Sequence, residues 1–240
     1  MTGAADVPTR ASRAARALVP IVRAAAEDAL AVLLPTQCGG CGAPDHAVCG
    51  VCRAALAASP AAAALPGAVA DHAVWAALEY DGVVPRLLSA LKEHGRTDVA
   101  RALAEPLGAA VRCAIAELPP GVGSGEIALL PVPPSRRALR ARGYDPLRLL
   151  LRRARPSVPV LPGLHVVGRP RDQAALSAVE REENLRGVLR GDGSLTGRRV
   201  LIVDDVLTTG ATLREGTRAA TAAGGVVLGG IVLARVPRRR

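Results

Sequence analysis

One short stretch, residues 199–212, constrains the fold more than any other part of the chain. It reads Arg-Val-Leu-Ile-Val-Asp-Asp-Val-Leu-Thr-Thr-Gly-Ala-Thr. Its apolar run, Val200–Val203, has the length of one fully buried strand and is too short for a buried helix. A helical pattern follows over Leu213–Ala223 and ends at Gly224-Gly225, and a second apolar strand is expected over Val226–Ala234. The stretch therefore predicts a βαβ unit, the connection that builds parallel sheets.

The turn between this strand and this helix combines two carboxylates with a loop rich in hydroxyl groups. Its residues are Asp204 and Asp205, expected where the strand leaves the sheet, and then Thr208, Thr209, Gly210, Ala211 and Thr212. A helix N-terminus offers unpaired N–H groups, and glycine lets the backbone approach an anion closely. The two acids suit vicinal sugar hydroxyls or a divalent cation. The turn therefore predicts a sugar-phosphate site; the alternative is an ordinary turn capped by threonine.

This pattern is neither the Walker loop nor the glycine-rich motif of dinucleotide folds. It resembles the 5-phosphoribosyl-1-pyrophosphate (PRPP) motif of type I phosphoribosyltransferases. The resemblance implies that Asp204 and Asp205 hold the ribose 2′ and 3′ hydroxyls and that Thr208–Thr212 bind the 5′-phosphate. Many purine-using members have a carboxylate as general base at the position of Thr208, whereas orotate-type members have threonine. Either the acceptor needs no strong base or the loop only binds.

Composition limits how the core is built and which partners suit the chain. The 240 residues are half hydrophobic and include no Phe, so Ala, Val and Leu must form one core domain with a small appendage. The net charge of +10 is carried almost entirely by arginine, which suits phosphate recognition and is also what a GC-rich coding bias produces. Three aromatic residues are too few for a base-stacking platform.

Four cysteines form two Cys-x-x-Cys pairs near the N-terminus: Cys38, Cys41, Cys49 and Cys52. Glycines within and beside the pairs permit the turns that point both sulfurs of a pair at one centre. The spacing predicts a structural Zn²⁺ site with four thiolate ligands and no open position. Two disulfides are the alternative, and a reducing compartment counts against them.

The remaining sequence divides into segments of different composition. Residues 1–34 are expected to form a helical segment, residues 35–56 the zinc module, residues 57–72 an alanine-proline linker, residues 73–237 the main domain and residues 238–240 a basic tail. No stretch is long and apolar enough for a membrane span, so we expect no membrane insertion and a cytoplasmic protein.

In the main domain we expect strands over Ala73–Tyr80 and Ile127–Val132, helices over Val84–Leu91 and Asp98–Leu118, and a helix from Arg140 to Arg155. The residues that follow the second strand are expected to bind pyrophosphate, because open α/β sheets bind ligands at the carboxyl ends of their strands. They are Pro133, Ser135, Arg136 and Arg137. Lys92, the one lysine of the chain, is a further pyrophosphate candidate. The alternatives are a solvated basic turn and a solvated helix end.

The polar segment Gly168–Leu189 carries Arg169 and Arg171 and has little apolar periodicity. Its length and charge suit a mobile lid over a charged ligand. The alternative is a surface helix with Glu-Arg pairs.

Several motifs follow one another in a fixed order over Pro35–Arg235. They are the two cysteine pairs, Pro-Val-Pro-x-Ser-Arg-Arg, Arg-Gly-Tyr, Asp-Gln-x-x-Leu-Ser-x-x-x-Arg-x-x-Asn and the acidic PRPP motif. Together they resemble the ComF family, a group of zinc-bearing, phosphoribosyltransferase-like proteins linked to DNA uptake. The chain departs from the family at Asp145-Pro146, where Asn-Gln is usual, and at Leu189, where Phe is usual.

The resemblance implies three functions. The first is an enzyme in which a nitrogen nucleophile displaces pyrophosphate from Mg²⁺-bound PRPP; Asp204 and Asp205 would position the ribose, and Arg169 and Arg171 would stabilise the leaving group. The second is a factor that handles single-stranded DNA with the competence machinery. The third is a regulator that senses PRPP without turnover.

Overall fold

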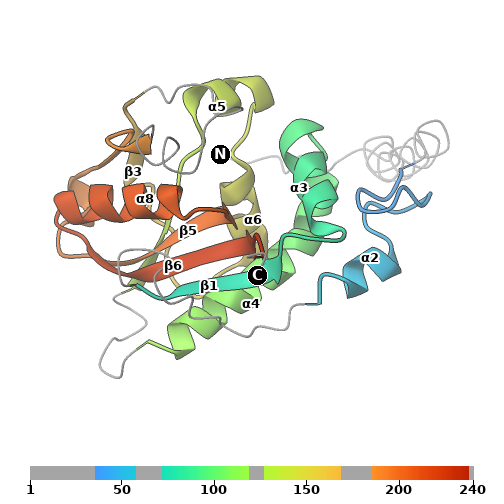
Figure 1. Cartoon of the computed structure of the whole chain (residues 1–240), viewed down its shortest axis with the longest axis horizontal. Coiled ribbons are helices and arrows are strands. Elements are labelled where there is room, and N and C mark those ends of the chain that lie inside the picture. The colour runs from blue at the N-terminus through green and yellow to red at the C-terminus, as the bar shows by residue number, and fades with distance from the viewer. Residues whose placement is uncertain (1–35, 58–71, 119–126, 169–184, 238–240) are drawn as a thin grey trace, which may run out of the picture.

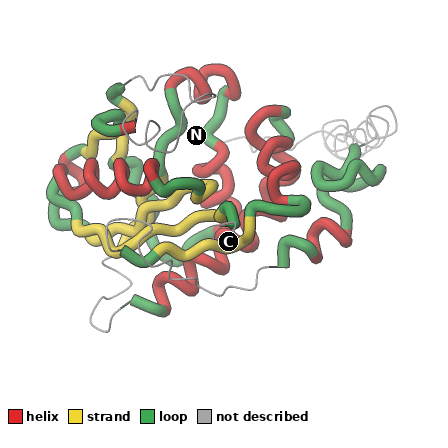
Figure 2. The backbone as a smooth tube through the Cα atoms, viewed as in Figure 1, coloured by secondary structure: helices red, strands yellow, loops and turns green. Residues whose placement is uncertain are grey.

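The computed structural model describes residues 36–57, 72–118, 127–168 and 185–237 (Figure 1). Within them the chain forms a central sheet with helices on both faces (Figure 2). The expected parallel α/β sheet flanked by helices is confirmed. The segment 1–34, residues 58–71 of the linker and the tail at 238–240 lie outside the described residues. Among the described helices, none is long and apolar enough to cross a membrane.

Four parallel strands form the main sheet in the spatial order β1, β6, β5, β2. Their bounds are β1 Val74–Glu79, β2 Ile127–Pro131, β5 Arg199–Leu207 and β6 Val226–Arg235. Strand β5 lies between β6 and β2, so its backbone is paired on both sides from Arg199 to Val203. Because all four strands are parallel, their carboxyl ends meet at one edge of the sheet.

Alternate side chains of each strand face opposite sides of the sheet, and both sides are buried. On β5, Leu201 and Val203 belong to one core cluster, whereas Val200 and Ile202 belong to the other. Both clusters consist mainly of Leu, Val, Ile and Ala, as the absence of Phe requires. The first cluster is covered by α3 Val84–Glu93, α4 Ala100–Ala116 and α6 Pro146–Ala154, and the second by α8 Ala211–Ala222.

The expected end of the strand Val200–Val203 is wrong, because β5 continues to Leu207. Asp204 and Asp205 therefore lie on the strand and not after it, and Asp204 is in register with Val232 of β6. The backbone of a neighbouring strand can pair with any residue, whatever its side chain, so an apolar run gives only a minimum length for a strand.

The single helix expected from Arg140 to Arg155 is also wrong. The structure has two helices there, α5 Arg136–Arg142 and α6. Gly143 ends α5 in the left-handed conformation with φ 75, and Pro146 occupies the first turn of α6. Tyr144 and Asp145 lie in the break between the two helices.

A second, antiparallel sheet pairs β3 Leu164–Val166 with β4 Leu189–Gly191. The short elements α2 Gly50–Ala54, η1 Thr97–Val99 and η3 Gly193–Leu195 complete the described structure.

An ion pair on α8 fastens this second sheet to the main domain. Glu215 is 5% exposed, and its Oε1 accepts a hydrogen bond from the backbone N–H of Leu189 at 2.9 Å. Arg218 donates to both oxygens of Glu215, at 2.7 and 2.8 Å, and to the carbonyl of Leu189 at 2.8 Å. Burial raises the pKa of Glu215, but the bonds from Arg218 and Leu189 outweigh it, so the pKa lies below its usual value.

We expect Glu215→Gln to lower the free energy of unfolding by about 2 kcal/mol at neutral pH, because hydrogen bonds to a buried charge are lost. A depressed pKa stabilises the fold above the ordinary value of 4.5, and this contribution is lost as the pH falls through the folded-state pKa. The difference between variant and wild type should therefore shrink in acid. Urea titrations at several pH values measure it.

The matched control is Glu105→Gln, which removes an exposed carboxylate and should cost less than about 1 kcal/mol. If Glu215→Gln has the same effect at neutral and acid pH, the ionised pair does not fasten β4 to α8.

Candidate functional site

Asp204 and Asp205 lie toward the carboxyl end of β5, where the interior strand of the sheet meets solvent. The backbone N–H of Asp205 donates to Oδ1 of Asp204 at 2.9 Å. Oδ2 of Asp205 forms an ion pair with Nζ of Lys92 at 2.6 Å, and the two side chains are 27% and 23% exposed. Lys92 is in the last turn of α3, so this helix and the central strand meet at the two acids.

A third carboxylate belongs to the same cluster. Asp145 caps α6 by accepting a hydrogen bond from the backbone N–H of Arg148 at 3.1 Å. Burial raises the pKa of Asp145, and the charge of Asp205 adds to that effect. Burial and the charge of Asp205 likewise raise the pKa of Asp204 well above its usual range, against the charge of Lys92. This cluster favours a ligand that brings hydroxyl donors or a cation.

The turn after β5 has the geometry of an anion site. Gly210 precedes α8 in the left-handed conformation with φ 80, which is free of strain only for glycine. The backbone N–H of Ala211 approaches Oγ1 of Thr209 at 3.4 Å, and Arg214 Nη1 donates to the carbonyl of Thr209 at 3.1 Å. Thr208 is exposed. The turn therefore opens the first N–H groups of a 12-residue helix toward the edge that carries the two acids.

The end of α3 is held in place by the last residue of α5 and by a residue just after that helix. The Tyr144 hydroxyl donates a hydrogen bond to the carbonyl of Leu91, and Arg142 pairs with Glu93 at 3.0 Å. These contacts flank Lys92 and fix it beside Asp205. Sequence reasoning treated Arg-Gly-Tyr only as a motif and Asp145 only as a departure from a family, and it assigned neither to the site. The position of these residues in and beside a motif indicated that they matter. No local sequence pattern, however, shows that they contact α3.

The residues expected to bind pyrophosphate lie at the same edge of the sheet. Val132 donates its backbone N–H to the carbonyl of Val203 at 2.9 Å, so the segment after β2 runs beside β5 up to Asp204. Ser135 caps α5, accepting from the backbone N–H of Ala138 at 3.2 Å. The candidates of this segment are half-buried Pro133 and Ser135 and exposed Arg136 and Arg137. The other two arginine candidates, Arg169 and Arg171, lie outside the described residues.

The four paired cysteines form a second site. Their sulfur atoms all lie within 4.8 Å of one another, and the sulfurs of Cys41 and Cys49 are 3.6 Å apart. Four sulfurs at about 2.3 Å from one zinc ion in a tetrahedron are roughly 3.8 Å apart, so the cluster could hold zinc with little adjustment. All four cysteines are free, and 3.6 Å is far too long for a disulfide bond.

The local backbone favours a thiolate at this cluster. The backbone N–H of Cys49 donates to the sulfur of Cys38 at 3.3 Å. Burial raises the pKa of the Cys38 thiol, but backbone N–H groups, that of Cys49 foremost, lower it to about 6. Burial raises the pKa of the Cys52 thiol. A metal ion is the usual means of balancing several thiolates at one place.

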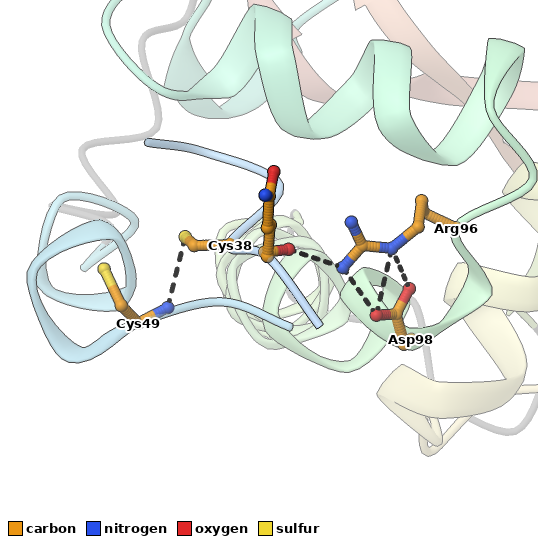
Figure 3. Close-up of polar contacts among 5 residues, drawn as sticks. Cys38, Cys49, Arg96 and Asp98 are labelled. Atoms are coloured by element: carbon orange, nitrogen blue, oxygen red, sulfur yellow. Dashed lines mark hydrogen bonds and ion pairs between the residues drawn. The ribbon is translucent and has the colours of Figure 1, made fainter. Parts of the chain in front are cut away.

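The cysteine cluster is packed onto the main domain. Cys38, Cys49 and Cys52 are buried in the same core cluster as Leu87 and Leu91 of α3. Arg96, between α3 and α4, donates to the carbonyl of Gln37 at 2.9 Å and pairs with Asp98 at 2.7 Å. Figure 3 shows Arg96 and Asp98 beside the loop that carries Cys38. Because α3 also carries Lys92, one helix connects the cysteine cluster to the acidic cluster.

Comparison with known proteins bears on this geometry. Residues 162–240 match the family model described as phosphoribosyl transferase domain. No curated protein matches the chain at a significant level. The matched stretch contains β5, the Thr-Gly turn, α8 and β6, about a third of the chain. That third is similar to phosphoribosyl transferase domains, and the parallel sheet flanked by helices fits the fold of the type I phosphoribosyltransferases.

Proposed function

We propose that the chain binds PRPP at the edge formed by β5, α8 and α3, and transfers its phosphoribosyl group to a nucleophile with release of pyrophosphate. One observation carries the proposal: two adjacent aspartates lie near the carboxyl end of an interior parallel strand, which is followed by a glycine turn that opens a helix. The match of residues 162–240 to phosphoribosyl transferase domains supports it.

The chain's own residues supply two kinds of contact. The first N–H groups of α8 and the hydroxyls of Thr208, Thr209 and Thr212 bind the 5′-phosphate. Asp204 and Asp205 accept hydrogen bonds from the ribose hydroxyls and hold C1′ in place. The three carboxylates of the cluster also offer the hard oxygen ligands that Mg²⁺ prefers, so the donor set fits that ion. When bound, Mg²⁺ neutralises charge on the pyrophosphate.

Lys92 and the segment Pro133–Arg137 flank the side from which pyrophosphate departs. In the structure Lys92 neutralises Asp205. When the ribose hydroxyls bind Asp205, the ammonium group turns to the pyrophosphate oxygens, with Ser135, Arg136 and Arg137 as further donors. Arg169 and Arg171 belong to the same proposal as arginines that stabilise the leaving group.

The order of motifs along the chain supports placing it in the ComF family, with a structural zinc ion at the four cysteines. The domain boundaries proposed for such a protein are a zinc module at 35–56 and a transferase-like domain at 73–237. A role with single-stranded DNA or the competence machinery stays a prediction from the resemblance.

We expect Asp204→Asn/Asp205→Asn to weaken PRPP binding by about a hundredfold, because two hydrogen bonds to charged groups are lost. Isothermal titration calorimetry with PRPP and Mg²⁺ measures the affinity, and pyrophosphate release over a panel of nitrogen bases measures turnover. Glu105→Gln/Glu117→Gln, which removes one carboxylate on α4 and one at its C-cap, should leave binding unchanged. Full PRPP affinity in the aspartate variant contradicts the assignment, and tight binding without turnover favours the sensing regulator.

We expect Lys92→Gln to weaken PRPP binding by about tenfold and to leave ribose 5-phosphate binding unchanged or stronger, because only PRPP carries the pyrophosphate. Calorimetry with both ligands measures the ratio. Arg190→Gln, at an exposed site on β4, is the charge-matched control. An increase of affinity for both ligands would mean that Lys92 only competes for Asp205.

We expect the purified chain to contain one zinc ion, and Cys38→Ser to lose most of it, because the cluster offers four thiolate ligands and no others. Elemental analysis measures zinc. The thermal unfolding midpoint of the whole chain should also fall, since these cysteines share a core with α3. Cys113→Ser is the control and should keep its zinc. Undiminished zinc in the Cys38 variant argues against the site.

A further inference from the structure

A cavity of about 530 Å³ lies between α4 and α6, on the side of the sheet opposite α8. Five arginines line it, together with a single carboxylate, Glu105: Arg101, Arg112, Arg152, Arg153 and Arg155. None of these residues belongs to the acidic cluster, the Thr-Gly turn or the cysteine cluster. We call this cavity the arginine cavity.

Helix geometry explains how the charges converge. On α4, Arg101, Glu105, Gly108 and Arg112 follow one another at spacings that place them on one stripe of the helix. Gly108 lies against Ala154 at the end of α6, where a Cβ added to the glycine would be 3.5 Å from the Ala154 Cβ. The two helices thus meet at Gly108 and Ala154, which form the floor of the cavity. The arginines line its walls.

The end of α6 supplies the other wall. Arg152 and Arg153 lie in its last turn, and Arg155 follows in the left-handed conformation with φ 49. Few residues other than glycine adopt this conformation, which is unfavourable for a long side chain. It reverses the chain directly after the helix, so that Arg155 lines the cavity with Arg152 and Arg153.

The described part of the chain does not balance the positive charge in the cavity. Glu105 pairs at 3.3 Å with Arg53, which does not line the cavity. The five arginine side chains are exposed and form no ion pair with the described part of the chain. Guanidinium groups around one cavity repel one another, which opposes folding unless an anion binds among them.

We propose that the arginine cavity binds a compact oligophosphate, either free or as the phosphate tail of a nucleotide. The planar guanidinium group forms bidentate hydrogen bonds with phosphate oxygens, so five of them match several linked phosphates. The volume is in the range of small-molecule sites. No aromatic residue lines the cavity, so stacking of the bases of a nucleic-acid strand there has no support.

A second hollow, of about 600 Å³, adjoins the first and shares Arg152 and Arg155 with it. Its wall combines apolar residues, among them Pro156, Val158 and Pro162, with Tyr144 and with the charged Asp145 and Arg148, so it borders the acidic cluster at Asp145. A nucleoside attached to the phosphates would reach this hollow across the end of α6. Free tripolyphosphate would occupy only the first hollow, whereas a nucleotide would occupy both. The two hollows therefore allow an experiment to distinguish free oligophosphate from a nucleotide.

The test is calorimetric titration of the full chain, without added Mg²⁺, with tripolyphosphate and with a nucleoside triphosphate. We expect one site for each, and Arg152→Gln/Arg153→Gln should weaken both by at least about tenfold. Arg101→Gln/Arg112→Gln on α4 should do the same from the other wall. Similar affinities for the two ligands identify free oligophosphate, and tighter binding of the nucleoside triphosphate identifies a nucleotide.

Two further variants separate this site from general attraction to positive charge and from the PRPP site. Arg190→Gln/Arg198→Gln removes two exposed arginines outside both hollows and should leave the affinities unchanged. Asp204→Asn/Asp205→Asn should also leave them unchanged. The proposal is overturned if tripolyphosphate does not bind, if the Arg190 and Arg198 variant weakens binding equally, or if only a single-stranded oligonucleotide binds.

Discussion

The pairing of β5 with a strand on each side is the constraint on which the rest of the structure depends. An interior strand must satisfy its backbone hydrogen bonds with both neighbours, and its side chains enter two cores at once. The pairing with β2 ends at Val203, but the pairing with β6 continues to Leu207 and so keeps Asp204 and Asp205 on the sheet. The carboxylates are therefore attached to a strand whose backbone is still paired with β6, directly beyond the segment that is paired on both sides.

Placing the two acids there has an electrostatic cost that the neighbouring elements offset. Burial and the mutual repulsion of the carboxylates raise the pKa of Asp204. Lys92 of α3 offsets this cost by pairing with Asp205. Tyr144 and Arg142 keep Lys92 in position through their bonds to the end of that helix. Elements far apart in the sequence are thus held together around a charge cluster.

Helix α3 also joins the two sites. One side packs against the cysteine cluster, and its last turn reaches the acids. The cysteines share the core of the main domain, so the cysteine cluster and the Thr-Gly turn belong to the same packed unit. The arginine cavity lies on that same side of the sheet, between α4 and the end of α6. The positive charge of the chain is therefore concentrated at a cavity as well as spread over its surface.

The sequence by itself determined the elements whose signals are local. The strand at Val200, the Thr-Gly turn, the helix after it and the two cysteine pairs are all recognised from short-range patterns. Apolar runs, turn chemistry and knuckle spacing involve only residues that are near one another in the sequence.

Tertiary structure decided the rest. The extension of β5 depends on a partner strand, and the division of the helix at Gly143 sets Tyr144 against a helix distant in sequence. The pairing of Lys92 with Asp205, the inclusion of Asp145 and the convergence of five arginines each require residues brought together by packing. No sequence pattern predicts these contacts, because they form only when the helices pack against the sheet.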